Sequence, residues 1–144
     1  MVVRRVYGAW SIEIPASFAE TFIDGDNYWH AYDATRSVSL TSIVLTDGDQ
    51  PVEASRILRE IQPELGTPID EIPAGLAGWA FTSDAPPGAR ASRLLSGMVA
   101  IDGRMLLTTV TSDDLEWARR IWLSISEHPV AIGPEGKPDL FTPI

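Results

Sequence analysis

The chain has 144 residues, of which 44% are hydrophobic and 22% charged, and these values are typical of one globular domain with its own core. It contains no cysteine, which excludes disulfides, thiol catalysis and cysteine-ligated metals. Eleven basic and twenty acidic residues give a net charge of −9, so the sequence disfavours a nucleic-acid partner and docking on anionic lipid.

The N-terminal part of the chain predicts three strands. Apolar and polar residues alternate over residues 10–15, which is the pattern of a half-buried strand. A second strand is expected over 28–33, with aromatic residues on both faces, and a third over 36–46, which is rich in β-branched residues and serine. The segments 24–27 and 47–49 are expected to be turns, because Asp and Gly favour turns.

The hydrophobic period then changes from two to the period of a helix. Apolar residues recur at helical spacing from Ala54 to Leu65, and they form one stripe. Pro51 suits the first turn, where a missing N–H costs nothing. Gly66 and Pro68 are expected to end this helix.

A second group of strands is predicted after this helix. Residues 69–72 form a weak strand and 76–83 a stronger one, with Trp79 and Phe81 on one face. The segments 93–101 and 104–111 form a hairpin, because the intervening Asp-Gly supplies the positive φ values of a type I′ turn. The expected register pairs Ile101 with Arg104, Val99 with Leu106, and Leu95 with Val110. Both faces of the hairpin carry apolar residues, which predicts that both sides of the sheet are covered near its centre.

A second helix is predicted near the C-terminus, followed by an extended tail. Leu115, Ala118, Ile121, Trp122 and Ile125 form its buried stripe, Asp113 and Glu116 are expected to cap it, and Pro129 ends it. The fold expected is therefore α+β, in the order β-β-β-α-β-β-β-α, with about six antiparallel strands in an α/β/α three-layer sandwich. Residues 1–128 would form one domain and 129–144 the tail.

Two segments carry a resemblance to a known family. The strand at 10–15 ends in proline ahead of Phe18, and the strand at 106–111 is followed by Ser-Asp-Asp and a helix that carries tryptophan. In these features the chain resembles the PsbP/Mog-type fold family over most of residues 6–128. That family includes photosystem accessory proteins, a Ran-binding nuclear import factor, bacterial lipoproteins and chaperones that load secretion effectors. The resemblance implies a protein-binding role, although the lipoprotein branch needs a lipid-bearing cysteine that is missing here.

The sequence offers no catalytic motif, and we expect no catalytic residues, no metal site and no cofactor. His30 and His128 lie far apart in the sequence, and a zinc site needs three or four ligands. The Asp-Gly-Asp segments at 24–26 and 47–49 lack the closing Glu of a calcium loop and are expected to be turns. Ser96 lacks the flanking glycine of a hydrolase nucleophile elbow.

The segment 28–32 is the candidate binding site. Alternation places its three amphipathic rings, those of Tyr28, His30 and Tyr32, on one face of a strand. They would either lie under a helix or form a partner-binding patch, since tyrosine is enriched in interface hot spots. The groove expected from this pattern includes Tyr28, His30, Tyr32, Ser37, Ser39 and Thr41, with Trp117 extending it or packing in the core.

The leading hypothesis is a non-enzymatic protein-binding or accessory protein, chaperone-like and linked to secretion. The alternatives are a small hydrolase or isomerase that uses carboxylates and His30, and a self-associating domain that forms a homodimer. The longest nearly apolar run, residues 97–101, is far shorter than the roughly 18 residues needed to span a bilayer. No membrane span and no signal peptide are predicted, and the expected location is the cytoplasm.

Overall fold

The computed structural model describes residues 1–23, 28–60, 66–127 and 141–143. In chain order its elements are β1 Val2–Val6, β2 Trp10–Ile14, β3 Ala19–Ile23, β4 Tyr28–Tyr32, β5 Ser37–Val44, β6 Thr46–Asp47, β7 Gln50–Pro51, α1 Ala54–Glu60, β8 Thr67–Ile69, β9 Ala77–Asp84, β10 Arg93–Ile101, β11 Arg104–Thr111, α2 Leu115–Leu123, β12 Ser126–Glu127 and β13 Phe141–Pro143.

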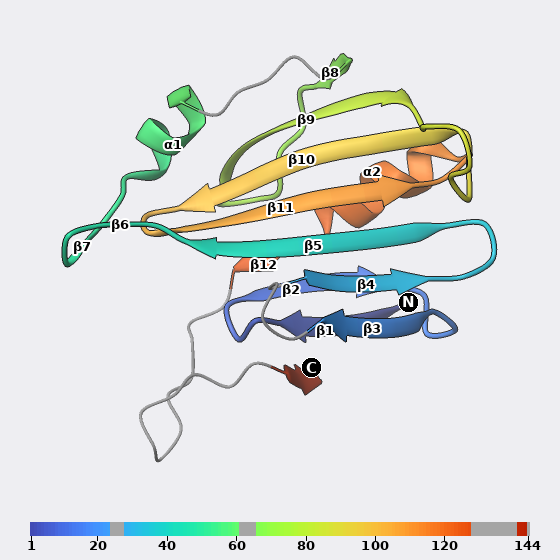
Figure 1. The fold of residues 1–144 in the computed structure, drawn as a ribbon, viewed down its shortest axis with the longest axis horizontal. Helices are drawn as coiled ribbons and strands as arrows, with labels where there is room; N and C mark the ends of the chain where they lie inside the picture. Colours follow the sequence, from blue (N-terminus) through green and yellow to red (C-terminus); the bar gives the residue numbers. More distant parts are fainter. Residues whose placement is uncertain (24–27, 61–65, 128–140, 144) are drawn as a thin grey trace.

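A seven-stranded antiparallel sheet forms the centre of the fold (Figure 1). Its strand order is β3-β4-β5-β11-β10-β9-β8, so a three-strand meander and a four-strand meander meet where β5 pairs with β11. A four-stranded sheet of order β12-β2-β1-β13 and the small β6-β7 pair complete the described strands. The described chain is thus α+β and mostly antiparallel, as the sequence predicts.

The hairpin of β10 and β11 has the predicted register. Ile101 pairs with Arg104, Val99 with Leu106, and Leu95 with Val110. Gly103 adopts a φ of +83°, which a residue with a side chain rarely adopts, but the φ of Asp102 is not positive. The predicted type I′ turn is therefore wrong, because that turn needs a positive φ at both central residues. The Asp-Gly step still connects the two strands in the predicted register.

One face of the large sheet is covered by α2 and by β1 and β2. Leu95, Val99, Leu106, Val110 and Val38 point to this side, and each is fully buried with the apolar residues of these elements. Figure 1 shows α2 behind β10 and β11.

Trp122 of α2 lies directly on the large sheet. A Cβ atom placed on Gly97 of β10 would lie 2.5 Å from Cζ3 of this ring. The indole Nε1 donates a hydrogen bond to the carbonyl oxygen of Glu71, 2.9 Å away, which fixes the ring at its outer end. The glycine is therefore required for close contact between the helix and the sheet.

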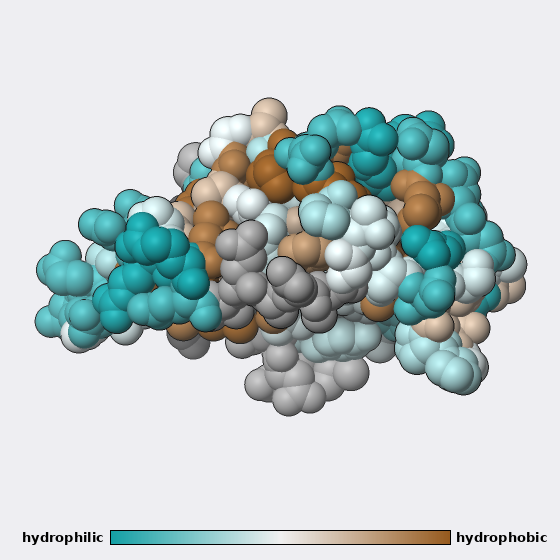
Figure 2. Space-filling view, turned by 90° about the horizontal axis from the view of Figure 1, so that it is seen from above, coloured by the Kyte–Doolittle hydropathy of each residue, from teal (hydrophilic) through white to brown (hydrophobic). Residues whose placement is uncertain are grey.

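The other face is covered by α1 at one end only. Ile57 of α1 packs with Trp79, Phe81, Met98 and Met105, which form a second and smaller core. Trp79 and Phe81 share this face, as their spacing predicts. Because α1 and α2 belong to different cores, they lie on opposite faces of the sheet. Viewed from the β8 edge, hydrophilic side chains gather at the end of the molecule where the β6-β7 hairpin projects (Figure 2).

The predicted element order is wrong in its number of strands. Seven strands precede α1 and two follow α2 in the described chain, and the large sheet alone has seven strands rather than about six. The sequence pattern does not reveal β1, β3 or the short strands β6, β7, β12 and β13. The weak strand expected over 69–72 is wrong in position, because the strand in this region is β8 at Thr67–Ile69. The layer that carries α2 is mixed, because β1 and β2 share it. A plain α/β/α sandwich therefore does not describe this side of the sheet.

The helix boundaries also differ from the prediction. Helix α1 comprises Ala54–Glu60, and residues 61–65 lie outside the described chain. The N-cap of α2 is Asp114 rather than Asp113: its carboxylate accepts hydrogen bonds from the backbone N–H groups of Glu116 and Trp117. Asp113 instead accepts two hydrogen bonds from Ser92.

The C-terminal segment returns to the N-terminus. Strand β13 pairs antiparallel with β1, so that Phe141 lies opposite Val6 and Pro143 opposite Arg4. Residues 128–140 and 144 of the predicted tail lie outside the described chain. Neither described helix has the length and apolar character that a bilayer crossing needs.

Candidate functional site

The part of the large sheet that α1 does not cover carries a polar face, which we call the open face. It is turned toward the reader in Figure 1, on the side away from α2. We define it by Tyr28, His30 and Tyr32 of β4, Ser37, Ser39 and Thr41 of β5, Thr109 and Thr111 of β11, and Ser96 of β10.

Strand register brings these residues together. Residues directly opposite each other in an antiparallel sheet project to the same side. His30 lies opposite Ser39, Ser39 opposite Thr109, and Thr109 opposite Ser96, so one row crosses four strands. Six of the seven predicted groove residues share this face.

Most of the open face is half-buried, in contrast to the face behind it, although Ser37 and Thr111 at one end are buried. On β4, Trp29 and Ala31 are fully buried, whereas Tyr28, His30 and Tyr32 between them are half-buried. This alternation is the pattern of a sheet with one covered and one solvated face. The sequence predicts that both sides of the sheet are covered near its centre. In the structure this is true only where α1 packs on the sheet.

The three rings of β4 form a ladder along the strand. The His30 and Tyr32 rings are stacked, with centroids 4.8 Å apart and an angle of 26° between the planes. The Tyr28 ring is 6.1 Å from the His30 ring and tilted by 40°. The Tyr28 hydroxyl lies 3.0 Å from the hydroxyl of Ser39. The faces of the His30 and Tyr32 rings thus meet each other, which leaves their edges and polar tips for contact with a ligand.

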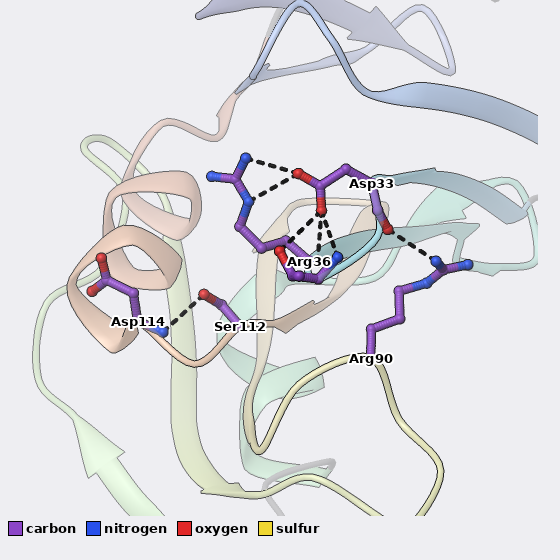
Figure 3. A network of polar contacts seen from close by, with 6 residues as sticks. Asp33, Arg36, Arg90, Ser112 and Asp114 are labelled. Atoms are coloured by element: carbon purple, nitrogen blue, oxygen red, sulfur yellow. Dashed lines mark hydrogen bonds and ion pairs between the residues drawn. The ribbon is translucent and has the colours of Figure 1, made fainter.

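Arg90 covers the end of this ladder. Its guanidinium carbon lies 4.5 Å from the centroid of the Tyr32 ring, which is cation–π geometry. Its Nη1 donates a hydrogen bond to the carbonyl oxygen of Asp33 at 2.9 Å, a contact drawn in Figure 3. The loop that carries Arg90 is fixed further along by the hydrogen bonds between Ser92 and Asp113.

The turn after β4 is fixed by the carboxylate of Asp33 (Figure 3). One oxygen accepts from the backbone N–H groups of Thr35 and Arg36, and the other from the Arg36 guanidinium at 2.8 and 3.2 Å. Although burial opposes ionisation, these hydrogen bonds hold the pKa of Asp33 below its ordinary value. The carbonyl that binds Arg90 therefore belongs to a rigid turn.

Trp117 does not belong to the open face. It lies on α2, buried in the core on the opposite side of the sheet. Its ring packs 5.9 Å from the ring of Phe18, and the Arg36 guanidinium lies 4.6 Å above it. Of its two expected roles, packing in the core is the one that the structure shows.

His30 has an altered acidity. Partial burial, together with the positive charge of Arg90, lowers the pKa of His30 from 6.5. The imidazole is therefore neutral at pH 7, and it can both donate and accept a hydrogen bond. Arg90 then carries the positive charge at this end of the open face.

The remaining candidates lie away from the open face. Asp47 and Asp49 are exposed, and Asp47 forms an ion pair with Arg56. Residues 24–27 and His128 lie outside the described chain. Among the described residues, no three His, Asp or Glu side chains gather into a group that could hold a metal ion.

Sequence reasoning missed Arg90, Ser96, Thr109 and Thr111 as members of this region. Arg90 occurs in a loop, where periodicity gives no signal. The three hydroxyl residues alternate with buried residues along β10 and β11, among them Leu95 and Val110. Alternation alone therefore places them on one face, but only the pairing of β5 with β11 places that face beside Tyr28, His30 and Tyr32.

These features define an α+β protein built on a mostly antiparallel sheet, with one helix on each face. No protein-family model matches the chain, and no match was found among curated proteins. The fold is similar to that of a protein from Bacteroides thetaiotaomicron VPI-5482, known from a crystal structure at 1.50 Å resolution. The TM-score is 0.56 at 11% identity, over 83% of this chain and 45% of the other, so this chain spans less than half of that protein. This likeness concerns the fold alone.

Proposed function

We propose that the protein is a binding protein, of the accessory or chaperone-like kind, whose open face receives a segment of another protein. The observation that supports this most is the ring ladder of Tyr28, His30 and Tyr32 beside a row of hydroxyl groups. Amphipathic rings and hydroxyls provide both apolar contact and hydrogen bonds, which is the composition of many interface centres.

The ring arrangement favours a polypeptide over a sugar as the ligand. A sugar-binding platform presents ring faces to the ligand, whereas here the faces of His30 and Tyr32 are turned to each other and Arg90 covers the end of the stack. The groups left for a ligand are hydroxyls, ring edges and the imidazole. These groups suit the N–H and C=O groups of a polypeptide.

The family resemblance supports the same proposal, since most PsbP/Mog-type proteins bind another protein. A location in the cytoplasm and a link to secretion are part of this proposal. The His-dependent hydrolase is less well supported, because no carboxylate is among the groups that contact or face His30 in the described chain. These groups are Tyr28, Tyr32, Ser39, Thr21 and the charge of Arg90. The nearby carboxylate of Asp33 is bound by its own turn.

Site-specific photo-crosslinking in cells of the source organism tests the proposal. A photoreactive amino acid is placed at Thr109 in the centre of the open face, or at Thr21, which lies opposite His30 on the edge strand β3. The matched control position is Glu116, which is exposed on α2 on the other side of the sheet. We expect one protein to be crosslinked from both open-face positions and not from Glu116.

The crosslinked protein is then purified and its affinity measured directly. Tyr32→Ser, which removes a ring from the ladder, is expected to weaken its binding. Equal crosslinking at Glu116, or unchanged affinity with this variant, would contradict the proposal. Crosslinks to a second copy of the same chain would support the homodimer instead.

A further inference from the structure

Arg90 is held in place by two neutral groups, a backbone carbonyl and an aromatic ring, without an ion pair among the described residues. Six of the arginines pair with a carboxylate in the described chain, namely Arg4, Arg36, Arg56, Arg93, Arg104 and Arg119. Arg90 forms no such ion pair there: its contacts are the Tyr32 ring and the carbonyl of Asp33. It is exposed in a chain whose net charge is −9.

The contacts of Arg90 leave part of its binding capacity unused. A guanidinium has five N–H donors in a planar fork, and one nitrogen, Nη1, donates to Asp33. Stacking on Tyr32 uses the face of the group and leaves donors along its edge. A guanidinium held in this way is pre-organised to bind a carboxylate with two parallel hydrogen bonds.

The position of Arg90 also ties it to the open face. The Tyr32 ring beneath it is the last ring of the ladder, and Ser37 and Thr111 lie in the same row of the sheet as Tyr32. Leu94 of β10 lies opposite Thr111 and is half-buried, so this row ends in an apolar side chain. Ser37 and Thr111 are buried, so the half-buried or exposed groups of this row are the Arg90 guanidinium and the Tyr32 ring at one end and Leu94 at the other. A ligand along this row would therefore meet a positive charge first and then an apolar side chain.

We infer that Arg90 is a carboxylate-binding subsite of the open face, and that it recognises an acidic side chain in a partner segment that also carries apolar residues. This inference rests on the proposed function and specifies the chemistry of the partner. The argument for this occupant is charge complementarity, because Arg90 is held in place without an ion pair among the described residues of an acidic protein. The net charge of −9 repels a partner with many negative charges, such as a phosphate backbone or an anionic lipid surface, far more than a segment with one acidic residue among apolar ones.

A random peptide library displayed on phage tests the inference, because it samples acidic and neutral segments alike. Purified protein is used to select peptides, and the frequency of Asp and Glu is compared with that in the unselected library. The same selection is made with Arg90→Gln and with Arg120→Gln. Arg120 is exposed on α2, and its replacement removes the same charge away from the open face.

We expect Asp or Glu, flanked by apolar residues, in the peptides selected by the wild type and by Arg120→Gln, but not in those selected by Arg90→Gln. Replacing the acidic residue of a selected peptide by its amide should weaken binding by about 10- to 100-fold, the size expected of a charge-assisted hydrogen bond. Arg90→Lys should bind more weakly than the wild type, because a lysine does not form the planar fork.

Selected peptides without acidic enrichment, or equal enrichment with Arg90→Gln, would overturn the inference. Crosslinking at Thr109 would still support the proposed function in that case, so the two failures are distinguishable. If light scattering shows a wild-type dimer that Arg90→Gln dissociates, the occupant is a second copy of the chain and the commitment to a foreign partner is wrong.

Discussion

Replacing Gly97 by alanine tests the contact between α2 and the large sheet. The added Cβ would lie 2.5, 2.8 and 3.0 Å from three carbons of the Trp122 ring. Carbon atoms in ordinary contact are about 3.5–4.0 Å apart, so the ring has to move by roughly 1 Å. It cannot do so freely, because it is fully buried and its Nε1 is bonded to the carbonyl of Glu71.

Two effects of opposite sign determine how much Gly97→Ala changes the free energy of unfolding. Overpacking of a well-packed core destabilises a protein by about 1–3 kcal/mol. Replacing a glycine in a strand interior recovers about 0.5–1 kcal/mol of conformational entropy. We therefore expect Gly97→Ala to lower the free energy of unfolding by about 1–2 kcal/mol, which corresponds to a fall in Tm of roughly 3–8 °C.

Urea denaturation followed by tryptophan fluorescence measures this change. Ser96→Thr is the matched control, because it adds one methyl group to the adjacent residue on the half-buried opposite face. Its effect should stay within about 0.5 kcal/mol. In a Trp122→Phe background, where the most distant ring carbons are missing, Gly97→Ala should cost at least about 1 kcal/mol less than in the wild type.

Two results would refute this reasoning. One is a Gly97→Ala variant as stable as the wild type, which would show that the helix shifts without cost. The other is an equal loss of stability in the wild-type and Trp122→Phe backgrounds, which would show that the ring is not the obstacle.

Three further predictions concern the cap of α2, the open face and the first turn. Asp114→Ala should cost about 1 kcal/mol and Asp113→Ala less, because Asp114 alone caps α2; a larger effect of Asp113→Ala on thermal unfolding would contradict this. An NMR titration should give His30 a pKa below 6.5, and the pKa should rise in Arg90→Gln because a nearby positive charge is lost. Since the pKa of His30 is lower in the folded than in the unfolded state, the unfolded state binds more protons. This contribution therefore lowers stability as the pH falls below about 6.5. A value of 6.5 or above in the wild type would be incompatible with the burial of the ring. Tyr7→Phe should cost about 1 kcal/mol in chemical denaturation, since the buried hydroxyl donates to a backbone carbonyl of β5; no loss would mean that this bond does not stabilise the fold.

The parts of the fold that the sequence predicts best are held by local signals. The hairpin of β10 and β11 follows from its Asp-Gly turn and from alternation along both strands. Strand β1 escapes prediction because two consecutive arginines break its alternation, and because its partner β13 comes from the other end of the chain. Its turn is hidden as well, since Tyr7 has a φ of +58°, a conformation that its residue type does not suggest.

The candidate site is predictable as a face but not as an exposed surface. A period of two places Tyr28, His30 and Tyr32 together in any strand. Whether a helix covers them depends on the length and position of α1, which packs beside Met98 and Met105 rather than over β4. The position of Arg90 over the ladder depends on tertiary contacts of its loop, and a periodic sequence pattern does not predict such contacts.

The pairing of β5 with β11 has a consequence for how the protein is made. Strands β3, β4 and β5 form one meander and β8 to β11 another, and the two join through residues about seventy positions apart in the sequence. Closing so long a loop is entropically unfavourable until both meanders exist, so their junction is expected to form late in folding. Because Ser39 and Thr109 face each other across that junction, a chain still emerging from the ribosome has no complete open face. Under the proposed function, binding of a partner segment would therefore begin only after synthesis has passed β11.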